Sequence, residues 1–135
     1  MVKITVGSLQ FRARLETQHA PKTCAAFRKL LPLREKLIQA RWSGQAAWVP
    51  LGDLETGLGY ENATTYPGAG ELLIYPGGVS ETEILFPYGQ TCFASKAGQL
   101  AGNHFATVVE GREHLAEIGE RVLWQGAQPI HFIER

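Results

Sequence analysis

Two glutamates separated by a single residue are the first candidates for chemistry in this chain. Glu81 and Glu83 lie in the segment Ser80-Glu81-Thr82-Glu83. Because side chains alternate along a β-strand, we expect both carboxyl groups on one side of it. Carboxylates that close together can raise each other's pKa and serve as acid and base. The alternative is a solvated strand end, since glutamate is usually exposed.

A histidine, His104, is the second candidate. Imidazole titrates near neutral pH and can transfer a proton or orient a ligand carbonyl. If His104 lies near Glu81 and Glu83, the three side chains could also hold a divalent metal. The alternative is a half-exposed strand residue that follows a turn at Asn103. The residue types alone leave both roles open.

The composition restricts the partners of the chain. Thirteen Lys and Arg residues balance thirteen Asp and Glu residues, and 44% of the residues are hydrophobic. A neutral globular composition argues against general attachment to nucleic acid or to a membrane, which needs a surplus of basic side chains. No CxxC, GxGxxG or Walker pattern occurs. We therefore expect no cofactor or resident metal, and a small molecule or a peptide as partner.

The compartment is inferred from the start of the chain and from its cysteines. The first residues alternate between apolar and polar types, without the unbroken apolar core of a secretory signal, so we expect a cytoplasmic protein. Cys24 and Cys92 are far apart in the sequence and fit no metal motif. We expect both to be buried thiols rather than a disulfide.

Hydrophobic periodicity predicts a mainly β domain over residues 1–135. Alternation on both sides of Gly7-Ser8 predicts a hairpin over 2–15, and helical spacing between Pro21 and Pro32 predicts a helix over 21–31. Residues 37–51 and 71–110 read as strands, and 52–70 as a long surface loop. We expect a short helix over 112–118 that ends at Gly119, followed by two short β segments. About eight strands and two helices predict a closed barrel, which hides strand edges.

Three segments, in order, resemble the cyclophilins. Ala20 to Leu30 is similar to the first helix of that family, and Tyr88 to Ser95 to a strand that carries a Gly-Ser-Gln-Phe-Phe run. Leu100 to Phe105, followed by Val108 to Gly111, resembles the stretch before the last cyclophilin helix. The resemblance covers nearly the whole chain and implies an eight-stranded cyclophilin-like barrel capped by two α-helices.

The departures from cyclophilins concern the catalytic residues. Cyclophilins carry a Phe-His-Arg run whose arginine polarises the peptidyl-prolyl amide, whereas the matching segment, Trp42 to Val49, contains no arginine. The Gln-Gly-Gly-Asp-type segment that follows in cyclophilins is also missing. The segment from Tyr75 to Glu83 is similar to DUF3830, a bacterial cyclophilin-like branch without an assigned activity. Prolyl isomerase activity is therefore not expected.

The resemblance implies a groove on the outer face of the barrel, bordered by residues 52–70. Its expected lining residues are Trp42, Tyr88, Phe93, Asn103 and His104, with Glu81 or Glu83 at the rim. The first hypothesis is a domain that binds a small polar molecule or an extended peptide there. The alternative is a metabolic enzyme, or an accessory subunit of a hydrolase, that uses Glu81, Glu83 and His104. The many aromatic residues of the chain also suggest that it forms a twofold homodimer.

Overall fold

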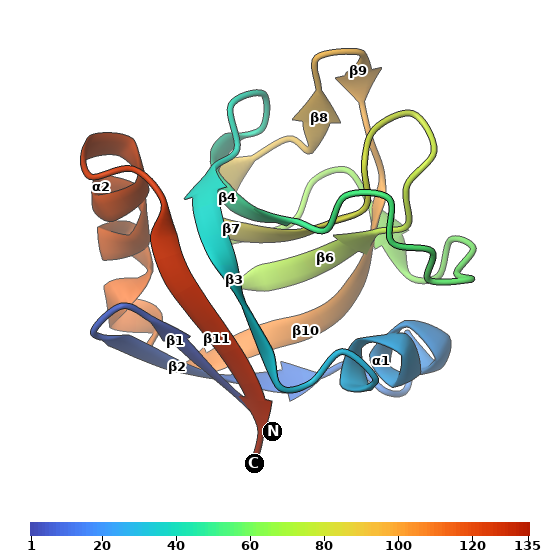
Figure 1. Ribbon diagram of the computed structural model, residues 1–135, viewed down its shortest axis with the longest axis horizontal. Coiled ribbons are helices and arrows are strands. Elements are labelled where there is room, and N and C mark those ends of the chain that lie inside the picture. The colour runs from blue at the N-terminus through green and yellow to red at the C-terminus, as the bar shows by residue number, and fades with distance from the viewer.

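The computed structural model describes residues 1–135 and is mainly β (Figure 1). Two α-helices, α1 (Pro21–Arg28) and α2 (Leu115–Trp124), and a 3-10 turn, η1 (Arg112–His114), accompany the strands. The strands are β1 (Val2–Val6), β2 (Leu9–Leu15), β3 (Leu33–Gln39), β4 (Gly44–Pro50), β5 (Ala63–Thr64), β6 (Glu71–Tyr75), β7 (Glu83–Thr91), β8 (Ala94–Ser95), β9 (Gly98–Gln99), β10 (Gly102–Glu110) and β11 (Gln128–Glu134).

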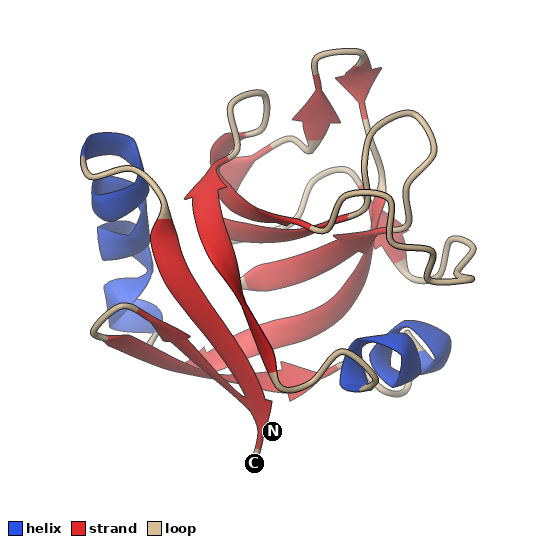
Figure 2. Ribbon diagram, in the orientation of Figure 1, coloured by secondary structure: helices blue, strands red, loops and turns tan.

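Eight strands close into an antiparallel barrel, as expected. Their order is β2-β1-β11-β3-β4-β7-β6-β10, and pairing between β10 and β2 closes the ring. The short strand β5 adds to β10, and β8 and β9 form a separate hairpin. Figure 2 shows the strands forming one continuous wall, with the two helices outside it. This is the cyclophilin-like barrel that the sequence resemblance implies.

The barrel interior is filled by side chains. Every second residue of β1 and β2 is buried, because successive side chains on a strand point to opposite faces. Three phenylalanines pack at the end nearest α1: the ring centroid of Phe27 lies 4.7 Å from that of Phe105 and 5.6 Å from that of Phe132. A small barrel filled in this way leaves the outer surface as the place for a binding site.

The second helix differs from the prediction. We expected a helix that ends at Gly119, but α2 continues through this residue to Trp124, and β11 is a single strand. Gly119 is buried against β7: a Cβ atom at this position would lie 2.3 Å from Cε1 of Tyr88. The glycine is therefore explained by the close approach of Tyr88 and not by a helix end. The first helix begins at Pro21, as expected, and ends three residues early, at Arg28.

A second hydrophobic cluster lies outside the barrel wall. It joins residues of β4, β6 and β7 to Phe93 and Leu100, which flank the β8–β9 hairpin. Phe93 is completely buried and packs its ring edge-on against Tyr75, with centroids 5.8 Å apart. In Figure 1 the β8–β9 hairpin, the 40–43 turn before β4 and the 76–82 loop after β6 gather at one end of the molecule. This cluster supports the floor of the candidate site.

Both cysteines are free thiols; Cys24 is buried and Cys92 is half-buried. The Cys24 side chain points to the backbone oxygen of Phe105, with sulfur and oxygen 3.4 Å apart, and burial raises the pKa of its thiol. None of the helices has the length and apolar character that a membrane span requires.

Candidate functional site

Glu83 is a buried glutamate at the start of β7. It lies opposite Pro50 of β4 on one side and Tyr75 of β6 on the other. Leu85, two residues further along, belongs to the outer hydrophobic cluster, so Glu83 faces the outside of the barrel wall. Its side chain is nevertheless covered, and the residue is only 7% exposed. The 76–82 loop, the 40–43 turn and the β8–β9 hairpin meet around it.

The carboxyl group of Glu83 has no partner within the protein. No backbone or side-chain group donates a hydrogen bond to it, and it belongs to none of the five ion pairs of the chain. Burial, together with the negative charge of nearby Glu81, raises the pKa of Glu83 to about 8. At neutral pH the group is therefore mostly a neutral carboxylic acid, able to donate one hydrogen bond.

A cavity of about 420 Å³ opens above Glu83, and we call it the Glu83 pocket. Its apolar walls include Ile38, Trp42 and Trp48, and Ser80 contributes from the 76–82 loop. The volume falls within the range of small-molecule sites, which combine apolar walls with a few polar groups.

Two basic side chains also line the Glu83 pocket. Arg41 comes from the turn between β3 and β4, and Lys96 from the β8–β9 hairpin. Neither forms an ion pair with a carboxylate of the chain. The guanidinium carbon of Arg41 lies 5.6 Å from the ring centroid of Trp42, in a cation–π arrangement.

The 76–82 loop is held over the pocket by Tyr75. The buried hydroxyl of Tyr75 accepts hydrogen bonds from the backbone N–H groups of Val79, at 3.0 Å, and Ser80, at 3.3 Å. Phe93 packs edge-on against the Tyr75 ring. Two glycines, Gly77 and Gly78, have φ angles of 92° and 125°, which allow the chain to turn back after β6.

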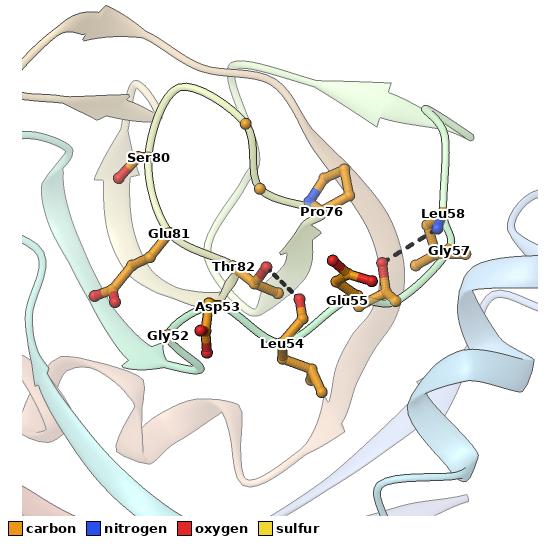
Figure 3. Close-up of a pocket in the computed structure, with 13 residues that line it drawn as sticks. Gly52, Asp53, Leu54, Glu55, Gly57, Leu58, Pro76, Ser80, Glu81 and Thr82 are labelled. Atoms are coloured by element: carbon orange, nitrogen blue, oxygen red, sulfur yellow. Dashed lines mark hydrogen bonds between the residues drawn. The ribbon is translucent and has the colours of Figure 1, made fainter.

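A second, more open cavity of about 810 Å³ lies next to the Glu83 pocket, between residues 52–58 and the 76–82 loop. We call it the loop pocket (Figure 3). Ser80 lines both cavities. The hydroxyl of Thr82 donates a 2.8 Å hydrogen bond to the carbonyl of Leu54 and ties the two loops together. Asp53, Glu55 and Glu81 give this cavity an acidic lining.

His104 lies in a different hydrogen-bonded chain. Its Nε2 is 2.8 Å from the Thr107 hydroxyl, which in turn donates a 2.8 Å hydrogen bond to Oε1 of Glu16. Burial alone would raise the pKa of Glu16, but hydrogen bonds from Thr107 and Arg14 lower it below its ordinary value. Because the single hydroxyl proton of Thr107 goes to Glu16, Nε2 of His104 must carry the proton it donates to Thr107. Nδ1 of the neutral ring is then the free acceptor.

Asn103 has a structural environment. Its fully buried amide donates hydrogen bonds to the Thr23 hydroxyl, at 3.1 Å, and to the Gly59 carbonyl, at 2.9 Å, while its oxygen accepts one from the Glu61 backbone N–H at 3.0 Å. The carboxylate of Glu61 accepts hydrogen bonds from the backbone and hydroxyl of Thr23. Burial would raise the pKa of Glu61, but these hydrogen bonds lower it. Asn103 thereby joins α1 to the 52–70 loop.

Of the five residues expected to line one groove, only Trp42 lines the Glu83 pocket. Phe93 and Asn103 are completely buried, and Tyr88 packs between Gly119 and Gln39, whose side-chain oxygen accepts a 2.7 Å hydrogen bond from the Tyr88 hydroxyl.

The proposed set of Glu81, Glu83 and His104 does not form a metal centre. No group of three or more His, Cys, Asp or Glu side chains is placed to hold a metal ion. His104 turns to Thr107, on its own strand, and is not among the residues that line the Glu83 pocket. Glu81 and Glu83 do interact, because the charge of Glu81 raises the pKa of Glu83.

Comparison with protein-family models matches residues 2–134 to DUF3830, described as a protein of unknown function. The chain belongs to the DUF3830 family. None of the curated proteins matches this DUF3830 chain significantly.

Among solved structures, the DUF3830 chain is similar to one described as McbB in complex with tryptophan, with a TM-score of 0.77 and 18% sequence identity. The match covers 100% of this chain and 45% of the McbB chain, so the DUF3830 chain spans less than half the length of that structure. At this identity the likeness shows the fold.

The sequence did not predict the basic side chains of the Glu83 pocket. Arg41 reaches the pocket from the turn between two barrel strands, and Lys96 reaches it from the separate β8–β9 hairpin, so neither position is set by the residues next to Glu83 in the sequence. The burial of Glu83 had a local signal: residues 84–87, Ile-Leu-Phe-Pro, form an apolar run typical of a strand covered on both faces. Such a strand leaves no solvated face for a glutamate at its start.

Proposed function

We propose that this DUF3830 domain binds a small molecule in the Glu83 pocket. The observation that carries the proposal is a glutamate that is only 7% exposed and has no hydrogen-bond partner for its carboxyl group, in the lining of a cavity with two tryptophans in its walls. A largely buried polar group without a partner costs free energy. A bound molecule that pairs with Glu83 would recover this cost.

A small molecule fits the pocket better than an extended peptide does. The walls come from three separate loops that close around Glu83, whereas a peptide usually adds to an open strand edge or follows a long groove. The closed barrel leaves no free edge next to Glu83, since β7 is paired on both sides, with β4 and β6. This geometry supports the small-molecule form of the binding hypothesis.

The tryptophans provide a direct test of binding. Trp42 and Trp48 line the pocket, whereas the third, Trp124, is 81% exposed at the end of α2 and does not. In a two-dimensional NMR titration, a bound molecule should shift the indole N–H signals of Trp42 and Trp48 and leave that of Trp124 unchanged. L-Tryptophan is a suitable first probe, because the structural neighbour holds it; a set of amino acids, aromatic acids and amines follows.

Variants of two tryptophans, one inside the pocket and one outside it, provide the matched controls. Trp42→Ala should abolish the binding of any molecule found in this way, while Trp124→Ala, which removes an exposed indole elsewhere, should not. A panel that leaves the signals of Trp42 and Trp48 unchanged throughout would contradict the proposal. A shift confined to Trp124 would place binding outside the Glu83 pocket and would contradict it equally.

An acid–base enzyme is the second candidate function, and the pKa of Glu83 favours it. A carboxyl group with a pKa of about 8 is protonated at neutral pH yet close to its titration range, as a general acid must be. In this version Glu83 donates its proton to a bound substrate, and Glu81 helps to keep the pKa high. The test is turnover of an identified ligand: Glu83→Gln should retain binding and abolish turnover.

We also propose that the domain lacks prolyl isomerase activity. The segment from Trp42 to Val49 contains no arginine that could polarise a peptidyl-prolyl amide, and electrostatic support of this kind usually provides most of such a rate. A standard proline-peptide assay should give the uncatalysed rate. Acceleration comparable to that of an ordinary cyclophilin would overturn this part of the proposal.

A further inference from the structure

The charges that line the Glu83 pocket differ in sign from those of the adjacent loop pocket. Three carboxylates line the loop pocket: Asp53, Glu55 and Glu81. The Glu83 pocket is lined by two cations, Arg41 and Lys96, and its one acidic residue is Glu83 itself. Since Glu83 is mostly protonated at neutral pH, the lining carries a net positive charge.

The two cations are available to a ligand. Each of the five ion pairs of the chain lies elsewhere, so neither Arg41 nor Lys96 is neutralised by a protein carboxylate. The two come from different segments and line the same cavity, which concentrates positive potential there. Arg41 is also stacked near Trp42, and this contact orients the guanidinium beside the aromatic wall.

We propose that the ligand of the Glu83 pocket is a small planar organic acid. Its flat apolar body packs against Trp42 and Trp48, its carboxylate pairs with Arg41 and Lys96, and a second acceptor atom receives a hydrogen bond from Glu83. This inference rests on the proposed function and specifies the ligand class. A primary amine is the competing class, because it would pair with a deprotonated Glu83. The two cations would repel it.

The groups that face Glu83 determine how binding depends on pH. Glu81 approaches from the 76–82 loop, Arg41 from the turn before β4, and Lys96 from the β8–β9 hairpin. Tyr75, opposite Glu83 on β6, has its hydroxyl hydrogen-bonded to the loop backbone.

Ionisation of Glu83 removes its hydrogen-bond donor and adds a negative charge. The affinity for an organic anion should therefore fall as pH rises through about 8, and the affinity for an amine should rise.

Two probes that share one ring system separate these alternatives. The acid probe is 2-naphthoate and the amine probe is 2-naphthylmethylamine, each titrated by calorimetry and by the indole N–H signals of Trp42 and Trp48. At pH 6.5 we expect the acid to bind about tenfold more tightly than the amine, because the two cations of the pocket attract the acid and repel the amine. Between pH 6.5 and 9 the affinity for 2-naphthoate should decrease about fivefold or more.

Charge-removing variants assign the effect to the pocket. Arg41→Gln and Lys96→Gln should each weaken 2-naphthoate several-fold, while Lys36→Gln, which removes an exposed cation of β3 outside the pocket, should not. Glu83→Gln should remove the decrease in 2-naphthoate affinity between pH 6.5 and 9, because its amide does not titrate in this range. Thermal unfolding of each variant confirms that it is folded.

The outcomes separate this inference from the proposed function. Suppose that 2-naphthylmethylamine shifts the indole N–H signals of Trp42 and Trp48 and binds at least as tightly as 2-naphthoate. Binding in the Glu83 pocket is then supported, and the organic-acid assignment is wrong. An unchanged affinity for 2-naphthoate in both Arg41→Gln and Lys96→Gln would also overturn the assignment. If neither probe nor any member of the wider panel shifts the two indoles, the proposed function fails together with it.

Discussion

Tyr75 and Glu83 lie directly opposite each other on β6 and β7, and both are buried although they face the outside of the barrel. Side chains at paired positions point to the same side of a sheet. Tyr75 holds the 76–82 loop through two backbone hydrogen bonds, and this loop covers Glu83. The loop over Glu83 is thus held by a hydroxyl group of the neighbouring strand.

Removal of that hydroxyl should loosen the loop. We expect Tyr75→Phe to lower the free energy of unfolding by about 1 kcal/mol, to speed hydrogen exchange at the N–H groups of Val79 and Ser80, and to lower the pKa of Glu83 as water reaches it. NMR measures both the exchange and the titration. Tyr60→Phe is the control, because Tyr60 is 62% exposed. Unchanged exchange at Val79 and Ser80 would show that Tyr75 does not anchor the loop.

Glu83 should make the stability of the fold depend on pH. Its pKa is about 8 in the folded chain and about 4.3 in an unfolded one. Between these values the folded state retains a proton that the unfolded state has released, so the contribution of Glu83 to the free energy of unfolding falls as pH rises and levels off above about 8. Below the lower value both states are protonated, and the contribution of Glu83 to stability is at its highest.

The neutral isostere tests this linkage. Glu83→Gln should be more stable than the parent at pH 9, by on the order of a few kcal/mol, and close to it at pH 4. Denaturant midpoints at pH 4, 6.5 and 9 measure the difference. Glu81→Gln should lower the pKa of Glu83, because it removes a neighbouring negative charge, and so reduce the loss at high pH. Parallel stability curves for the parent and Glu83→Gln would mean that Glu83 titrates normally.

The elements that the sequence predicted correctly are those fixed by local patterns. Alternation over residues 2–15 predicts the β1–β2 hairpin, and Pro21 marks the start of α1. Gly119 was misread as a helix end because its partner, Tyr88, comes from a distant strand. For the same reason the sequence indicated Glu83 as a candidate but not its surroundings: its pocket is assembled from three segments that meet only in the closed barrel.

Gly119 should not accept the substitution that helices usually favour. Gly→Ala inside a helix commonly stabilises it by about 1 kcal/mol, but a Cβ at position 119 would lie 2.3 Å from the Tyr88 ring. We expect Gly119→Ala to destabilise the fold by about 1–3 kcal/mol, the usual cost of overpacking. Chemical denaturation measures this cost. In a Tyr88→Ala background the same change should become neutral or stabilising; an equal cost in both backgrounds would contradict the packing explanation.

The hydrogen-bonded chain from Glu16 through Thr107 should fix the tautomer of His104. The Thr107 hydroxyl donates its proton to Glu16 and can only accept from Nε2 of His104, so the neutral imidazole carries its proton on Nε2. Nitrogen-15 shifts of the ring distinguish this form from the other tautomer, and the exposed His19 serves as the reference.

Thr107→Val removes the bridging hydroxyl while keeping a similar shape. It should release the tautomer preference of His104, raise the pKa of Glu16 and cost about 1 kcal/mol of stability. A His104 ring protonated on Nδ1 in the parent protein would reverse the assigned direction of the chain, since Thr107 would then have to donate to Nε2 and could no longer donate to Glu16.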